Sequence, residues 1–180
     1  ASSMEKLANR LSEMRGAAMK VGQLLSMDSG QMLPAQLSQV LARLREDAHP
    51  MPLGQVAKVL KGEWGVGWEK NFERFFFTPI AAASIGQVHE ALLRDGRRLA
   101  IKIQYPGVRR SIDSDVDNVA SLLRLFKLLP DELDIGPLFE EAKRQLRVEA
   151  DYRQEAASLN QYAEQLINDD RFLLPQVVET

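Results

Sequence analysis

The stretch Ala81–Gln104, AAASIGQVHEALLRDGRRLAIKIQ, decides the expected fold. Two short segments rich in β-forming residues flank the sequence RDGR, which is a typical hairpin turn. We therefore predict an antiparallel hairpin over about residues 85–104. On its second strand Ala100, Lys102 and Gln104 alternate with three apolar residues and so share one face.

The residues before and within this hairpin resemble a nucleotide site. Ala81, Ala83, Gly86 and Val88 occupy the four signature positions of the protein-kinase loop G-x-G-x-x-G-x-V, with alanine replacing the first two glycines. Lys102 in LAIK matches the lysine of V-A-I-K, which contacts the α- and β-phosphates. Alanine restricts the backbone and adds a methyl group, so we predict an altered phosphate loop. Taken alone, such a loop is also typical of a turn or helix start, and a strand lysine is more often solvated.

Helical patterns flank the hairpin on both sides. Residues 1–70 show apolar side chains at three- and four-residue steps and read as an all-helical N-terminal extension. After the hairpin we predict one helix over about 114–129 and another over about 137–167. The final stretch, RFLLPQVVET, is typical of a strand.

Composition excludes several classes of function. The formal net charge is −2 and no basic run is interleaved with aromatic residues, so nucleic acid is not an expected partner. The chain has no cysteine, and His49 and His89 lack metal-ligand spacing, so we predict no metal site in this chain. No apolar run approaches the ~20 residues that span a bilayer, and the start at Ala1 lacks the features of a signal peptide.

Four motifs in order resemble one family. They are KVGQ (Lys20–Gln23), AAAS (Ala81–Ser84), AIKIQYPGV (Ala100–Val108) and EADYRQEA (Glu149–Ala156). They look like the KxGQ motif, alanine-rich loop, nucleotide lysine and ExD motif of the UbiB family of atypical protein-kinase-like proteins, in particular the branch that supports coenzyme Q biosynthesis. The resemblance runs from about Leu11 to the end of the chain.

The resemblance implies an α+β fold. Residues 1–70 would form the helical extension, and residues 71–180 a kinase-like N-lobe with a small antiparallel sheet, the inserted helix and an αC-type helix. It also implies ATP binding with magnesium, and an ATPase-like activity in membrane-associated lipid metabolism. The nucleotide-binding residues would be Ala81, Ala82, Ala83, Ser84, Ile85, Gly86, Val88, Ala100 and Lys102.

The KxGQ helix raises a separate question, because Met14–Met27 retains Gly16 and Gly22 although each interior glycine costs about 1 kcal/mol relative to alanine. Gly16, Lys20 and Gln23 share one helix face. The resemblance implies that this face folds over the nucleotide pocket, with Lys20 reaching the ExD group where a protein substrate would sit. The two glycines would then permit close packing against the lobe. Otherwise Lys20 is an ordinary surface lysine.

On a regular helix Glu149 and Asp151 lie about 200° apart, so they cannot both point the same way. Asp151 and Glu155, four residues apart, share a face. We assign Glu155 as the ion-pair partner of Lys102, with Glu149 as the other candidate. From the resemblance, Glu149 and Asp151 face Lys20 or a metal. A cluster of solvated helix charges is the plainer interpretation.

Neither H-R-D-x-x-x-x-N nor D-F-G occurs in the sequence. We therefore expect the C-lobe and its magnesium ligands to lie outside these 180 residues, and the chain alone not to turn over ATP. A lone lobe exposes its interdomain face and is prone to self-association.

The resemblance adds isoprenoid lipid, a membrane surface or coenzyme Q biosynthetic proteins as partners. The location would be cytoplasmic or peripheral at the inner membrane in bacteria, and the matrix side in mitochondria. The alternative is a non-catalytic helical module, a pseudokinase scaffold that binds lipid or protein.

Overall fold

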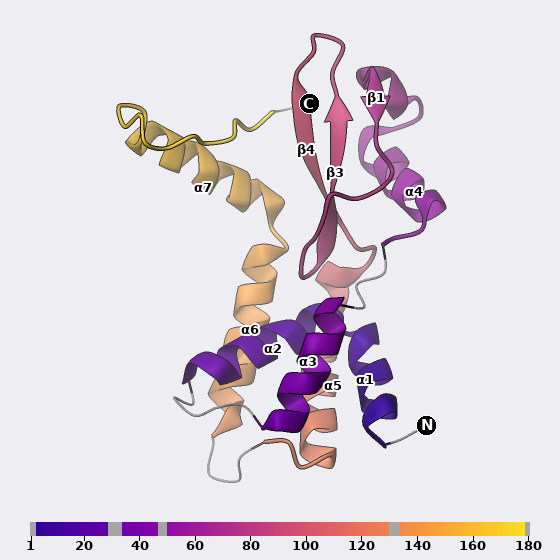
Figure 1. Cartoon of the computed structure of the whole chain (residues 1–180), viewed down its shortest axis with the longest axis vertical. Helices are drawn as coiled ribbons and strands as arrows, with labels where there is room; N and C mark the ends of the chain where they lie inside the picture. Colours follow the sequence, from indigo (N-terminus) through magenta and orange to yellow (C-terminus); the bar gives the residue numbers. More distant parts are fainter. Residues whose placement is uncertain (1–2, 29–33, 47–49, 130–133, 179–180) are drawn as a thin grey trace.

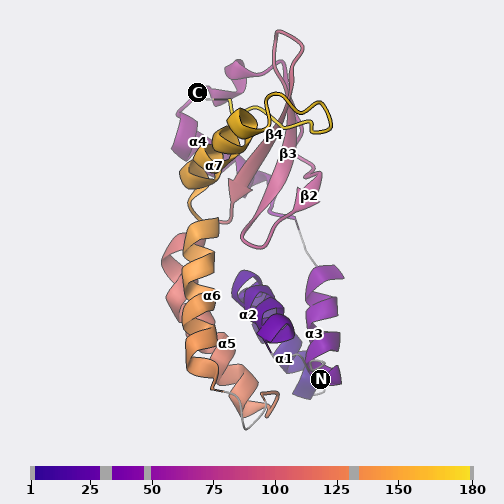
Figure 2. The same cartoon turned by 90° about the vertical axis from the view of Figure 1, so that its left-hand side faces the viewer.

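A helical part and a small antiparallel sheet make up the computed structural model, which describes residues 3–28, 34–46, 50–129 and 134–178. The predicted α+β class is confirmed. In chain order the elements are α1 (Ser3–Glu13), α2 (Arg15–Asp28), α3 (Ala35–Glu46), α4 (Leu53–Trp64), the 3-10 turn η1 (Trp68–Asn71), β1 (Arg74–Phe75), β2 (Ala81–Ala82), β3 (Gly86–Leu92), β4 (Arg98–Gln104), α5 (Val108–Leu125), α6 (Ile135–Glu149) and α7 (Tyr152–Gln165). The hairpin β3–β4 stands at one end with α4 and α7 on either side of it, and the other helices gather at the opposite end (Figures 1 and 2).

The sheet is organised around β3. Strand β4 pairs with it antiparallel over its whole length, from Gly86 opposite Gln104 to Leu92 opposite Arg98, while β1 and β2 pair with its other edge. One face of the hairpin packs on α4 and on an aromatic group around Trp68 in a hydrophobic cluster. Alternation along the strand leaves the opposite face for Lys102.

Helix α2 lies at the centre of the helical part and packs against α1, α3, α5 and α6. Its residues Val21 and Leu25 are buried in a second hydrophobic cluster, which also contains Ile85 from the turn between β2 and β3. The turn predicted to cover phosphates is therefore anchored in the helical core by its own apolar side chain.

The two clusters divide the chain differently from the expected boundary near residue 70. Helix α4 precedes that boundary but packs on the sheet, whereas α5 and α6 follow it but pack on α2. The inserted helix begins at Val108 instead of about 114, directly after Gly107, whose φ of 78° ends the preceding extended segment. It ends at Leu125.

Two segments differ from the sequence predictions. The helix expected over about 137–167 is two helices, α6 and α7, which are separated at Ala150–Asp151. Residues 171–178, expected to form a strand, contain none. Phe172 and Leu173 are 54% and 98% exposed there, because this stretch pairs with no strand edge in the part of the chain that the structure describes.

The hairpin requires glycine at position 86. A Cβ atom at Gly86 would stand 2.3 Å from the backbone oxygen of Ile103, which cannot move without breaking the strand pairing. We expect Gly86→Ala to lower the free energy of unfolding by about 1–3 kcal/mol, as overpacking does. The matched control Gly62→Ala lies in helix α4 with nothing within 4 Å and should stabilise by up to about 1 kcal/mol. Urea unfolding of both variants checks this, and an unchanged Gly86→Ala midpoint would contradict the proposed packing.

Candidate functional site

An ion pair joins the sheet to the last helix. The Lys102 Nζ atom on β4 donates to both carboxylate oxygens of Glu155 on α7, at 2.9 and 2.7 Å. The same ammonium lies 4.7 Å from the centre of the Tyr152 ring, a cation–π distance. Lys102 is therefore held from two sides by the first turn of α7. The sequence had left open whether Glu149 or Glu155 is its partner, and the structure places Glu155 there.

The strand face around Lys102 carries small and branched apolar residues. Val88 stands directly opposite Lys102 on β3, and Ala81 on β2 stands directly opposite Val88. Directly paired residues share a sheet face, so these side chains form one row across three strands. Ala81 and Ala100 are exposed. This face is thus open above the two alanines and bounded by the Lys102–Glu155 pair.

The alanine-rich turn closes tightly on itself. The Ala83 N–H donates to the Gly86 oxygen at 2.8 Å, so Ala83, Ser84 and Ile85 form a narrow loop. Arg15 on α2 reaches the Ala83 oxygen at 3.4 Å, and the Ser84 hydroxyl donates to Glu149 at 2.9 Å. The turn is consequently tied to both α2 and α6.

A second ion pair connects α2 to the end of α6. Lys20 is 7% exposed, and its ammonium donates to Glu149 Oε1 and, at 3.2 Å, to Gln23 Oε1. Glu149 accepts from Ser84 with its other oxygen. Both carboxylate oxygens of Glu149 are thus engaged, one by the KxGQ helix and the other by the turn.

Asp151 does not join this group, which corrects the expectation that it faces Lys20 or a metal together with Glu149. Its side chain caps α7 by accepting from the Gln154 N–H at 3.1 Å. Gln104 donates to the Ala150 oxygen at 2.6 Å, which occupies a carbonyl that a continuous helix would use. Capping and this side-chain bond together separate α6 from α7. The break directs Glu149 toward Lys20 and leaves Glu155 to Lys102.

The two glycines of α2 meet different neighbours. A Cβ atom at Gly16 would stand 2.9 Å from the Ser84 backbone oxygen, so Gly16 does permit close approach to the hairpin turn. A Cβ atom at Gly22 would stand 2.4 Å from a methyl group of Leu41 on α3. Gly22 therefore serves packing within the helical part, not the packing against the lobe that we expected.

Sequence reasoning missed two residues that contact the site, Tyr152 and Arg15, and one buried polar residue of β3, Gln87. Tyr152 has a buried hydroxyl without a hydrogen-bond partner, and burial raises the pKa of this phenol well above its usual range. It stands three residues before Glu155, a spacing that could have placed it beside Lys102. Arg15 donates to the Leu44 oxygen at 2.8 Å and so ties α2 to α3. Gln87 is buried on the opposite face of β3 from Val88, where its side-chain nitrogen lies 2.7 Å from that of His89 and its oxygen accepts from the Met51 N–H.

The histidines do not suggest a metal site. His89 is fully buried and bonds to Gln87 and to the Phe76 oxygen, and His49 lies outside the described residues. Across the described ranges no three His, Cys, Asp or Glu side chains form a group that could hold a metal ion. In the same ranges no helix has the length and apolar character needed to cross a bilayer.

Comparison with known proteins identifies a family. Residues 43–180 match the ABC1 atypical kinase-like domain. The chain is 42% identical over 176 residues to the atypical kinase COQ8, mitochondrial, of Saccharomyces cerevisiae, covering 98% of this chain and 35% of that protein. It is 41% identical over 175 residues to the atypical kinase COQ8B, mitochondrial, of Danio rerio, covering 97% and 28%. The chain thus spans about a third of these curated relatives.

A solved structure agrees with the fold. The protein Rv3197 from Mycobacterium tuberculosis, in its complex with erythromycin, matches with a TM-score of 0.57 and 37% sequence identity. The match covers 98% of this chain and 46% of that one.

The unpartnered hydroxyl of Tyr152 gives a direct test of the site geometry. A buried hydroxyl without a partner carries an uncompensated desolvation cost, so Tyr152→Phe should raise the free energy of unfolding by up to about 1 kcal/mol. Tyr162→Phe, on the same helix and 60% exposed, should change nothing. Urea unfolding provides the measurement. A loss of stability in Tyr152→Phe alone would show that the hydroxyl has a partner.

Proposed function

Because this chain belongs to the ABC1 atypical kinase-like family, we propose that it is the ATP-binding part of a UbiB-type atypical kinase or ATPase. The names of its relatives describe atypical kinases, which supports a transferase of phosphorus-containing groups for the full-length protein. We propose that the C-lobe and the magnesium ligands lie outside the 180 residues, and that these residues alone do not turn over ATP. The process served is the metabolism of ubiquinone or a related isoprenoid lipid.

The observation that carries this proposal is the Lys102–Glu155 pair. Two contacts of 2.9 and 2.7 Å hold the ammonium at the edge of an open strand face, beside the alanine-rich turn. The Lys102 side chain is 34% exposed, so an anionic ligand could reach it. A lysine oriented by a helix carboxylate is the arrangement with which protein kinases hold the α- and β-phosphates.

The residues around Lys102 fit a nucleotide. Bound ATP would supply the transferable phosphoryl group. The exposed residues Ala81 and Ala100 leave space for a flat base on the strand face. The amide N–H groups of Ser84 and Ile85 have no hydrogen-bond partner among the described residues, and such backbone donors are what a phosphate loop offers.

In this proposal Lys20 and Gln23 are regulatory. The Lys20–Glu149 pair and the Ser84–Glu149 bond link the KxGQ helix to the turn, so displacement of α2 would release one side of the phosphate loop. Gln23 supports Lys20 as an acceptor at 3.2 Å.

The partners beyond nucleotide are proposed from the family. An isoprenoid lipid, a membrane surface or coenzyme Q biosynthetic proteins are the candidates. The yeast and zebrafish relatives are named as mitochondrial proteins, which supports the matrix side for a eukaryotic source. For a bacterial source the corresponding place is the cytoplasmic side of the inner membrane.

Removal of the Lys102 ammonium tests the nucleotide role. In the full-length protein, Lys102→Met should weaken the affinity for MgATP by about 10- to 100-fold, because a hydrogen bond to a charged group contributes about 1.5–3 kcal/mol. Lys58→Met removes the same charge from an exposed position on α4 and should leave the dissociation constant unchanged. Isothermal titration calorimetry measures both.

Equal affinities in Lys102→Met and wild type would contradict the phosphate role. If the wild type itself binds no nucleotide but floats with liposomes, the lipid-binding scaffold is the function instead.

A further inference from the structure

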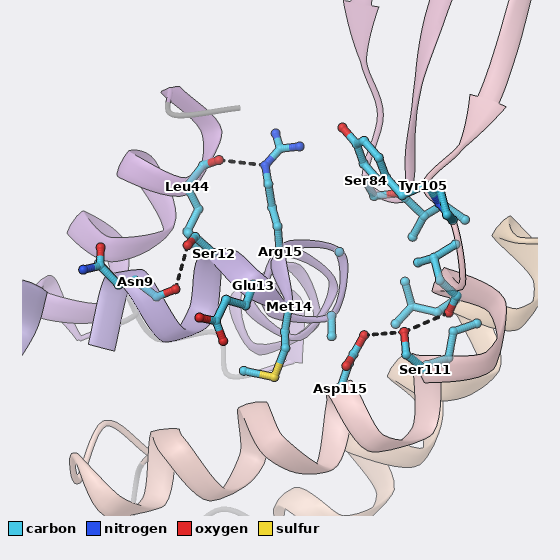
Figure 3. Close-up of a pocket in the computed structure, with 18 of the residues that line it drawn as sticks. Asn9, Ser12, Glu13, Met14, Arg15, Leu44, Ser84, Tyr105, Ser111 and Asp115 are labelled. Carbon is cyan, nitrogen blue, oxygen red and sulfur yellow. Dashed lines mark hydrogen bonds between the residues drawn. The ribbon is translucent and has the colours of Figure 1, made fainter. Parts of the chain in front are cut away.

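A cavity of about 490 Å³ lies where the N-terminal helices meet the base of the hairpin (Figure 3). Its walls come from α1, α2, α3, the turn at Ser84–Ile85, the connection after β4, and helices α5 and α6. Neither Lys102 nor Glu155 lines it, so it shares only the turn at Ser84–Ile85 with the proposed nucleotide site. The volume is in the range of small-molecule sites, about 300–1,000 Å³.

Four charged side chains line this cavity without pairing with one another. Arg15 and Arg43 are the cations, and Glu13 and Asp115 are the anions. In the part of the chain that the structure describes, none of the four takes part in an ion pair. Their charges sum to zero, so the lining favours neither a simple anion nor a simple cation.

The charges are separated in space. Arg15 donates to the Leu44 and Ala83 oxygens, which places its guanidinium at the hairpin side of the cavity. Figure 3 shows this guanidinium on the same side as Tyr105, with the Glu13 and Asp115 carboxylates on the side toward α5. Asp115 accepts from the Ser111 hydroxyl at 2.7 Å through one oxygen only. Arg15 thus lies across the cavity from the two carboxylates, and Arg43 of α3 also lines the cavity.

The space between these sides is mostly apolar. Met14, Leu44, Ile85, Val108 and Ile112 line it. A ligand with one charge at each end and an apolar body would form charge-assisted hydrogen bonds at both ends and bury hydrocarbon between them. A ligand with a single charge would leave one pair of lining charges without a partner.

We propose that this cavity binds a small zwitterionic amphiphile. Its carboxylate would lie against Arg15 and Arg43, its ammonium against Glu13 and Asp115, and its apolar body along Met14 and Ile112. The site does not depend on the proposed nucleotide function, so it is tested without ATP.

The test uses ω-amino acids as probes for the 180-residue chain. 6-Aminohexanoate, 8-aminooctanoate and 12-aminododecanoate are titrated into ¹⁵N-labelled protein, with octanoate and octylamine as singly charged probes of matched length. We expect one of the zwitterions to bind at least tenfold more tightly than both single-charge probes, with amide shifts centred on Gly16, Ser84 and Ile112. Equal binding of octanoate or octylamine, or no binding of any zwitterion, would overturn the proposal.

Variants test the two ends separately. Asp115→Asn keeps an oxygen for the Ser111 hydroxyl but removes the charge, and Arg43→Gln removes one cation at an exposed position. Each should weaken the zwitterion about tenfold. Asp170→Asn and Arg110→Gln are exposed, do not line the cavity and should retain wild-type affinity. If the first two variants also bind normally, the charged lining plays no part and the proposal fails. The comparison of probes on the wild type stands even if a variant does not fold.

Discussion

The contact between Lys20 and Glu149 joins two helices of one hydrophobic cluster at the point where the alanine-rich turn meets them. Lys20 comes from α2, the central helix of the helical part, and Glu149 ends α6, which is followed by α7. Ser84 binds the same carboxylate, so the alanine-rich turn is fixed at the same point. Because Lys20 is buried, its ammonium needs an acidic partner, and loss of that partner would strongly lower the stability of the fold. Together with the Arg15 bond to the Ala83 oxygen and the buried Ile85 side chain, it positions the turn relative to α2.

The break between α6 and α7 gives each carboxylate of the acidic motif a different task. Glu149 faces α2, Asp151 caps α7, and Glu155 holds Lys102 on the sheet. On one regular helix Asp151 and Glu155 would share a face, and Asp151 could not cap a helix that does not begin there. The lysine of the strand and the lysine of the KxGQ helix are therefore positioned by neighbouring turns of the same chain segment. We expect a change in the Lys20–Glu149 contact to alter the Lys102–Glu155 contact, and the reverse.

Much of this arrangement could be predicted from local patterns. The four motifs identified the family, which the domain match confirms, and the assignment of Glu155 as the kinase-type partner of Lys102 agrees with the structure. What failed depended on contacts distant in sequence. The bond from Gln104 to Ala150 adds to the local Asp151 cap in ending α6, and the neighbour of Gly22 is Leu41 on another helix. The final stretch has strand composition, but a strand also needs an edge with which to pair.

The most direct test of this account is the coupling energy between Lys20 and Glu149. Urea unfolding of Lys20→Met, Glu149→Gln and the double variant forms a double-mutant cycle, in which Glu149→Gln retains an acceptor for Ser84. Because Lys20 is buried and the Glu149 side chain is 36% exposed, we predict a favourable coupling of about 1–2 kcal/mol, within the range for residues in contact. Additive effects of the two substitutions would mean that the two side chains do not interact and that packing and the Arg15 hydrogen bonds hold α2 in place.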